Sequence, residues 1–235
     1  MCFSATASFV ASGVLATIGV ATLRHVREPR ALLFASMPLL FAGHQLCEGL
    51  VWLAFHGEIG QIAPHHVALL FMLYALGILP TLMPAAVALM EPPGWRRIAI
   101  VGVTIVGALV CAWNIAGLIL FPIHAFVEHS SIAYRNAMTS NMVMSIIYIL
   151  STCGALLLSS HRVVRTYGVV NVIGLLIVHL VKGYAFASVW CFYAAIMSVM
   201  IYWQFHEREI DVETPNGTSP VHKPFLLSWL RGSQT

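Results

Sequence analysis

Residues 41–52 read Phe41-Ala-Gly-His44-Gln45-Leu-Cys47-Glu48-Gly-Leu-Val-Trp52, and they lie inside an apolar run from about Ala31 to Phe55. A helix of about 20 apolar residues crosses the hydrocarbon core of a bilayer, so this run predicts a transmembrane helix. Glu48 is the only carboxylate in any apolar run of the chain. Because an ionisable side chain is costly at such a depth, Glu48 marks a candidate functional site.

The composition predicts that the rest of the chain also lies in a membrane. Of the 235 residues, 59% are hydrophobic and 9% are charged, whereas about a quarter of the residues of a soluble globular protein are charged. Apolar runs lie at approximately residues 5–23, 31–55, 67–90, 97–120, 138–158, 167–185 and 188–205. We therefore expect an all-α fold, a seven-transmembrane-helix bundle over residues 1–206 in contact with the lipid bilayer. The polar residues 207–235 are expected to form a flexible tail.

The basic residues predict how this bundle is oriented. Arginines and lysines gather in alternate loops and in the tail, at positions 24, 27, 30, 96, 97, 162, 165, 208, 223 and 231. The other loops carry only Arg135, and Lys182 lies near the end of the sixth run. Since basic residues are retained in the cytoplasm, the N-terminus is predicted outside and the C-terminal tail in the cytoplasm. These basic residues have no nucleic-acid-binding motif around them, so we expect no nucleic acid partner.

Two further patterns concern helix packing. Pro80 and Pro84 in the third run should kink that helix, and neighbouring helices are expected to satisfy the carbonyls that the kink frees. Ser4, Ser8 and Ser12 form a stripe of small residues on the first run. This stripe predicts a face for close helix packing, with the lining of a pore as the alternative.

Polar residues of several runs fall at a similar depth. His44 and Glu48 are four residues apart and share a helix face, with Gln45 and Trp52 on or beside the same stripe. In the predicted orientation this stripe lies in the outer half of the membrane. The same half contains the following residues of other runs: Asn114, Asn141, His179 and Lys182. Together they predict one polar pocket that opens to the exterior, beneath a loop at about residues 121–137.

The first hypothesis for this pocket is a metal site. His44 and Glu48 can reach one ion from successive turns, and His179 or one of the loop histidines, His124 or His129, can complete a three-ligand set. Zinc in such a set keeps an open position for water and lowers the pKa of that water toward about 7. With Glu48 as the catalytic residue, the pocket would then belong to a zinc-dependent hydrolase of lipid-like substrates.

Three other interpretations stay open. A Glu48–Lys182 ion pair inside the bundle would indicate a non-enzymatic structural or accessory subunit that binds other membrane subunits. Glu48 as a proton or cation site would indicate a coupled carrier. His44 and His179 as axial ligands would indicate a haem-binding membrane subunit.

The five cysteines form no CxxC motif and are odd in number, so neither a disulfide framework nor a zinc ribbon is predicted. Cys47 neighbours Glu48 in the predicted pocket. Cys2 and Cys191 fall at the outer ends of their runs. They are expected either to form a disulfide between the first and last helices or to act as thiolate metal ligands.

Three stretches resemble a bacterial multi-span membrane family of unknown function. They are Met1-Cys-Phe-Ser-Ala-Thr-Ala-Ser-Phe9, the His44–Trp52 stretch, and Ser188-Val-Trp-Cys-Phe-Tyr-Ala-Ala-Ile-Met-Ser198. The resemblance extends over about residues 1–205. It implies a multi-pass protein of the bacterial inner (cytoplasmic) membrane, and it implies no activity.

Overall fold

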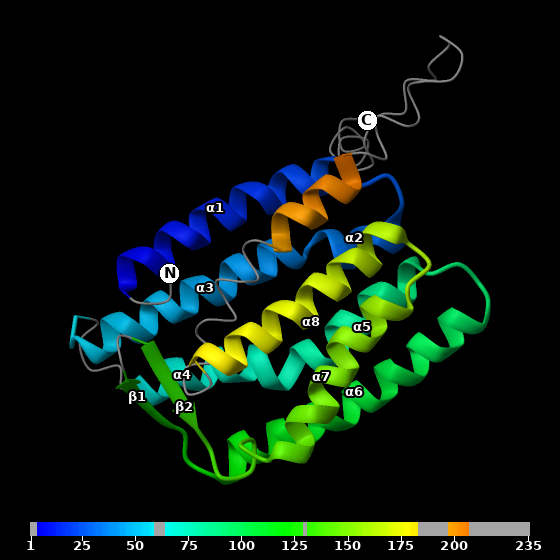
Figure 1. Ribbon diagram of the computed structural model, residues 1–235. Coiled ribbons are helices and arrows are strands. Elements are labelled where there is room, and N and C mark those ends of the chain that lie inside the picture. Colours follow the sequence, from blue (N-terminus) through cyan, green and yellow to red (C-terminus); the bar gives the residue numbers. More distant parts are fainter. Residues whose placement is uncertain (1–3, 59–63, 129–130, 183–196, 207–235) are drawn as a thin grey trace, which may run out of the picture.

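The computed structural model describes residues 4–58, 64–128, 131–182 and 197–206, with residues 131 and 178–182 described by their backbone alone. The chain is mostly helical (Figure 1). The elements are α1 (Ala5–Arg24), the 3-10 turn η1 (Pro29–Ala31), α2 (Leu32–Ala35), α3 (Met37–Phe55), α4 (Pro64–Met72), the π-helical segment η2 (Leu73–Ile78), α5 (Leu79–Met90), α6 (Trp95–Leu120), β1 (His124–Glu128), β2 (Ser131–Arg135), α7 (Met142–Leu158) and α8 (Arg162–Lys182). Residues 197–206 are also helical.

The helices are apolar enough to make this a membrane protein. Three continuous helical stretches, Ala5–Arg24, Pro64–Met90 and Trp95–Leu120, have the length and composition to cross a bilayer. Large apolar side chains on α6 are exposed along its whole length, from Ile98 (75% exposed) through Leu109 (67%) to Ile119 (75%). Water would not favour such a surface, whereas lipid covers it without cost.

Two predicted segments differ from the structure. The run from Ala31 to Phe55 is divided into η1, α2 and α3, with a break at Ser36. Pro38 in the first turn of α3 accounts for the break, because it has no N–H to donate to the carbonyl of Phe34 in the turn before it. The segment 121–137, expected as a loop, contains an antiparallel hairpin in which His124 pairs with Arg135 and Phe126 with Ala133.

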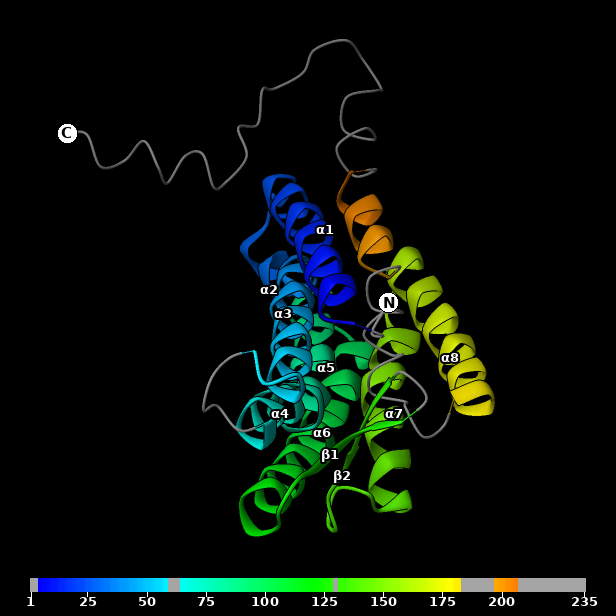
Figure 2. The same ribbon diagram turned by 90° about the vertical axis from the view of Figure 1, so that its left-hand side faces the viewer.

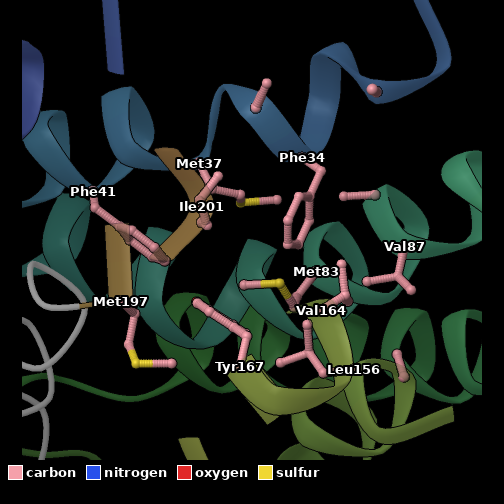
Figure 3. Packing of buried hydrophobic residues seen from close by; sticks show 14 of the residues in the cluster. Phe34, Met37, Phe41, Met83, Val87, Leu156, Val164, Tyr167, Met197 and Ile201 are labelled. Atoms are coloured by element: carbon pink, nitrogen blue, oxygen red, sulfur yellow. The ribbon is translucent and has the colours of Figure 1, made fainter. Parts of the chain in front are cut away.

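The described helices pack side by side in one bundle (Figures 1 and 2), and their buried residues form two apolar cores. The larger core joins helices that are far apart in the sequence. Figure 3 shows Phe34 and Met37 above residues of α5, α7, α8 and the helix 197–206, namely Met83, Val87, Leu156, Val164, Tyr167, Met197 and Ile201. The second core lies at the end of the bundle that carries the hairpin, and it contains Val51, Trp52, Phe71, Leu118 and Ile132.

Helices α1 and α3 pack against each other in antiparallel directions (Figure 1). The hydroxyl of Ser12 donates to the carbonyl of Ala42 at 2.8 Å. A Cβ atom added to Gly49 would lie 2.6 Å from the ring of Phe9, so the absence of a side chain at Gly49 is what admits that ring. Ser12 of the predicted serine stripe therefore contacts α3, as the packing interpretation predicts, whereas Ser4 is exposed and caps α1.

The stretch α4–η2–α5 is kinked, and neighbouring helices satisfy its freed carbonyls. Pro80 has no N–H to donate to Leu76, and the Leu76 carbonyl instead accepts from Nδ2 of Asn114 on α6 at 3.0 Å. The carbonyl of Ala75, inside the π-helical segment, accepts from the hydroxyl of Tyr148 on α7 at 2.9 Å. These contacts confirm the prediction made from the two prolines.

Candidate functional site

Glu48 and Gln45 form the most deeply buried polar pair of the predicted site. Glu48 is 0% exposed and Gln45 is 1% exposed, both on the face of α3 that points into the bundle. The amide Nε2 of Gln45 donates to Oε2 of Glu48 at 3.1 Å. A buried carboxylate requires such donors, because it loses its hydration on folding.

His44 lies one turn before Glu48 and is 7% exposed. Its Nε2 is 3.1 Å from the carbonyl oxygen of Phe71. A carbonyl can only accept, so Nε2 carries the hydrogen, and in the neutral ring Nδ1 holds the lone pair. The imidazole also stacks on the ring of Phe71, with 4.0 Å between centroids and 18° between planes.

The hairpin covers the far side of Phe71. The ring of Tyr134 on β2 stacks on the ring of Phe71 at 4.7 Å and 17°. His44, Phe71 and Tyr134 thus form one column of three rings contributed by α3, α4 and β2. The segment expected to lie over the predicted pocket does contact the His44 face of the bundle.

The other predicted pocket residues on α3, Trp52 and Cys47, lie close to Gln45 and Glu48 in the sequence. Trp52 is 4% exposed and belongs to the core at the hairpin end. Its indole Nε1 has no hydrogen-bond partner among the described residues. Cys47 is a half-buried free thiol.

Three residues assigned to the pocket or its cover have other contacts. Asn114 satisfies the kink carbonyl of Leu76. Asn141 caps α7, where its Oδ1 accepts from the backbone N–H groups of residues 143 and 144. His124 is exposed at the start of β1.

Several ligand candidates have no described side chain. His179 and Lys182 lie in the last five residues of α8, 178–182, for which the structure describes the backbone alone. Cys2, His129 and Cys191 lie outside the described residues. Within the described part of the chain, no three His, Cys, Asp or Glu side chains are close enough to hold a metal ion together. His44 and Glu48 therefore need a third ligand from outside that part if they bind a metal.

Sequence reasoning missed a second buried carboxylate, Glu91, which follows α5 and is 2% exposed. It accepts from the hydroxyl of Ser159 at 3.0 Å and from the backbone N–H of Ser160 at 2.9 Å. A negative charge just before α8 also interacts favourably with the dipole of that helix. The two serines that precede α8 were the only sequence signal that could have indicated partners for Glu91.

Comparison with known proteins identifies a family and no characterised relative. No curated protein and no solved structure matches the chain. The model of a family of unknown function, DUF6629, matches residues 1–215. The match includes α3 with His44, Gln45 and Glu48, and the hairpin that covers them. The chain is therefore a member of this family of unknown function, DUF6629.

Proposed function

We propose that this protein is a seven-span protein of the bacterial inner membrane that binds zinc through His44 and Glu48. The observation that carries the proposal is the fully buried carboxylate of Glu48, one helical turn from a histidine with a fixed tautomer. Ionisable groups inside membrane helices are rare because of their cost, and they mark ion or substrate sites. His44 and Glu48 are the right pair of ligand types for zinc.

The hydrogen bond of His44 supports a ligand role. Histidine ligands of metals usually donate their second ring N–H to a carbonyl or a carboxylate, which orients the ring and raises its basicity. Because the Phe71 carbonyl accepts the Nε2 hydrogen of His44, Nδ1 would be the ring atom that binds the metal. Gln45 orients the Glu48 carboxylate in the same manner.

We propose His179 of α8 as the third ligand, with water in the fourth position. A bound zinc would supply a water of lowered pKa at that position. The oxygen of the Glu48 carboxylate that does not bind the metal would take the proton of that water. The water oxygen would bond to the carbonyl carbon of an ester or amide, the acyl bond would break, and the proton would pass to the leaving oxygen or nitrogen. The apolar surroundings of Trp52 and Phe71 suit a lipid-like substrate.

The distribution of arginines supports the proposed orientation. Among the described residues, Arg24, Arg97 and Arg162 lie at the ends of α1, α6 and α8 that are remote from the hairpin. The end with fewer basic residues, which carries the hairpin, would face the exterior.

The test is the zinc content of detergent-purified protein, measured without a polyhistidine tag. We expect about one zinc per chain in the wild type and at least a tenfold loss in Glu48→Gln and His44→Ala. Glu91→Gln is the matched control, because it also changes a buried carboxylate, and we expect it to keep its zinc. A metal-free wild type, or equal loss in Glu91→Gln, would overturn the proposal.

A second candidate function is a non-enzymatic accessory subunit, and the packing of His44 favours it. The ring stack and the carbonyl bond of His44 hold α3 against α4 without any chemistry. This candidate predicts a Glu48–Lys182 ion pair. Glu48→Gln would then lower the unfolding temperature, and adding Lys182→Met would restore part of the loss, since it removes the charge left behind.

A further inference from the structure

Two buried polar groups near Glu48 have no partner among the described residues. They are the hydroxyl of Ser8, in a side chain that is 0% exposed, and the indole Nε1 of Trp52, in a side chain that is 4% exposed. Buried donors are nearly always hydrogen-bonded, and each exception calls for an explanation such as a bound water, ion or ligand.

Both groups belong to the same region of the bundle. Trp52 lies four residues after Glu48 and eight after His44, so the three side chains follow one stripe of α3. Ser8 lies one turn before Ser12, whose hydroxyl bonds to the Ala42 carbonyl. Because α1 and α3 are antiparallel and Phe9 packs on Gly49, the buried Ser8 lies on the turn of α1 that is level with Glu48 and Gly49.

Packing alone does not explain these residue types. An alanine at position 8 would fill nearly the same space as the serine. A phenylalanine at position 52 would be smaller than the tryptophan, but neither change would leave a buried donor unsatisfied. Removing such a donor is neutral or stabilising for the fold. The polar groups therefore carry a cost that a ligand would offset.

We propose that Ser8 and Trp52 donate hydrogen bonds to the carbonyl oxygen of an amphipathic ester or amide ligand bound beside the metal. This inference rests on the proposed zinc site. Trp52 can only donate at Nε1, so the ligand atom that it meets is an acceptor. The aliphatic and aromatic neighbours of Trp52, Val51, Phe71 and Leu118, would accommodate an alkyl chain rather than a charged group.

The experiment uses octanohydroxamate, an alkyl chain with a carbonyl that also binds zinc, titrated into zinc-loaded full-length protein in detergent. We expect Ser8→Ala and Trp52→Phe each to weaken its binding by about three- to tenfold, the loss of one hydrogen bond. Zinc content should stay at the wild-type level in both variants. The unfolding temperature should stay or rise in Ser8→Ala, and it should fall in Trp52→Phe because the smaller ring leaves a cavity. Acetohydroxamate should bind at least about tenfold more weakly than octanohydroxamate, because it lacks the chain.

Ser12→Ala is the matched control, since its hydroxyl already has a partner in Ala42. It should lower the unfolding temperature and leave hydroxamate binding unchanged. If the wild type holds zinc but the Ser8 and Trp52 variants bind octanohydroxamate as tightly as it does, the inference is wrong and the zinc site stands. Loss of zinc in either variant, or of thermal stability in Ser8→Ala, would also overturn it. If the wild type holds no zinc, the proposed function fails and this inference fails with it.

Discussion

At the scale of single residues, the sequence predicted the burial of Glu48 better than it predicted the partners of the pocket residues. An isolated carboxylate in an apolar run is visible without a structure, and so is its spacing from His44. Asn114 shows the limit of predicting side-chain contacts from the sequence. It was expected in the pocket, but its contact is with the Leu76 carbonyl. The sequence indicates that the Leu76 carbonyl lacks its helical donor, because Pro80 has no N–H. Which side chain replaces that donor depends on how α6 packs against the kink.

Asn114 and Pro80 should therefore be energetically coupled. Asn114→Leu removes the donor to Leu76 and should lower the free energy of unfolding by about 1–2 kcal/mol. In a Pro80→Ala background the restored N–H can bond the same carbonyl. The loss caused by Asn114→Leu should then shrink to about zero, as measured by a double-mutant cycle of unfolding in detergent. Equal losses in both backgrounds would show that Asn114 has another role.

At the scale of elements, apolar periodicity predicted the helices, and it failed where short-range chemistry decides the structure. Pro38 divides the second run because it lacks a backbone N–H, which a hydropathy average does not register. The hairpin was missed because its strands have five residues each and carry polar residues at their ends. The stacking of Tyr134 on Phe71, a contact between distant residues, anchors the hairpin to α4.

The kinked helix makes a prediction about α6. A Cβ atom on Gly107 would collide with the carbonyl of Pro80, which belongs to the rigid backbone of α5. Gly107→Ala should therefore destabilise the protein by about 1–3 kcal/mol. Gly102 is the control on the same helix, because nothing lies within 4 Å of its added Cβ. Gly102→Ala should be neutral or stabilising by up to about 1 kcal/mol. Similar unfolding temperatures for the two variants would contradict the packing described between α5 and α6.

At the scale of the whole molecule, composition was sufficient to identify a membrane protein, and the charge distribution supports one orientation. That orientation can be measured in intact cells with a membrane-impermeant maleimide. Val127→Cys, in the hairpin and 47% exposed, should be labelled from outside. Trp95→Cys, at the opposite end and 68% exposed, should react only after the cells are opened. The reverse pattern would place the hairpin and the polar site on the cytoplasmic side.

The most direct test of the zinc site is X-ray absorption at the zinc edge of the purified, untagged protein. The account predicts nitrogen and oxygen ligands alone, at about 2.0–2.1 Å, with the imidazole signature of two histidines and with an at least tenfold weaker zinc signal in His44→Ala. An absence of zinc, or a sulfur shell at about 2.3 Å that would indicate a cysteine ligand such as Cys47, would contradict it.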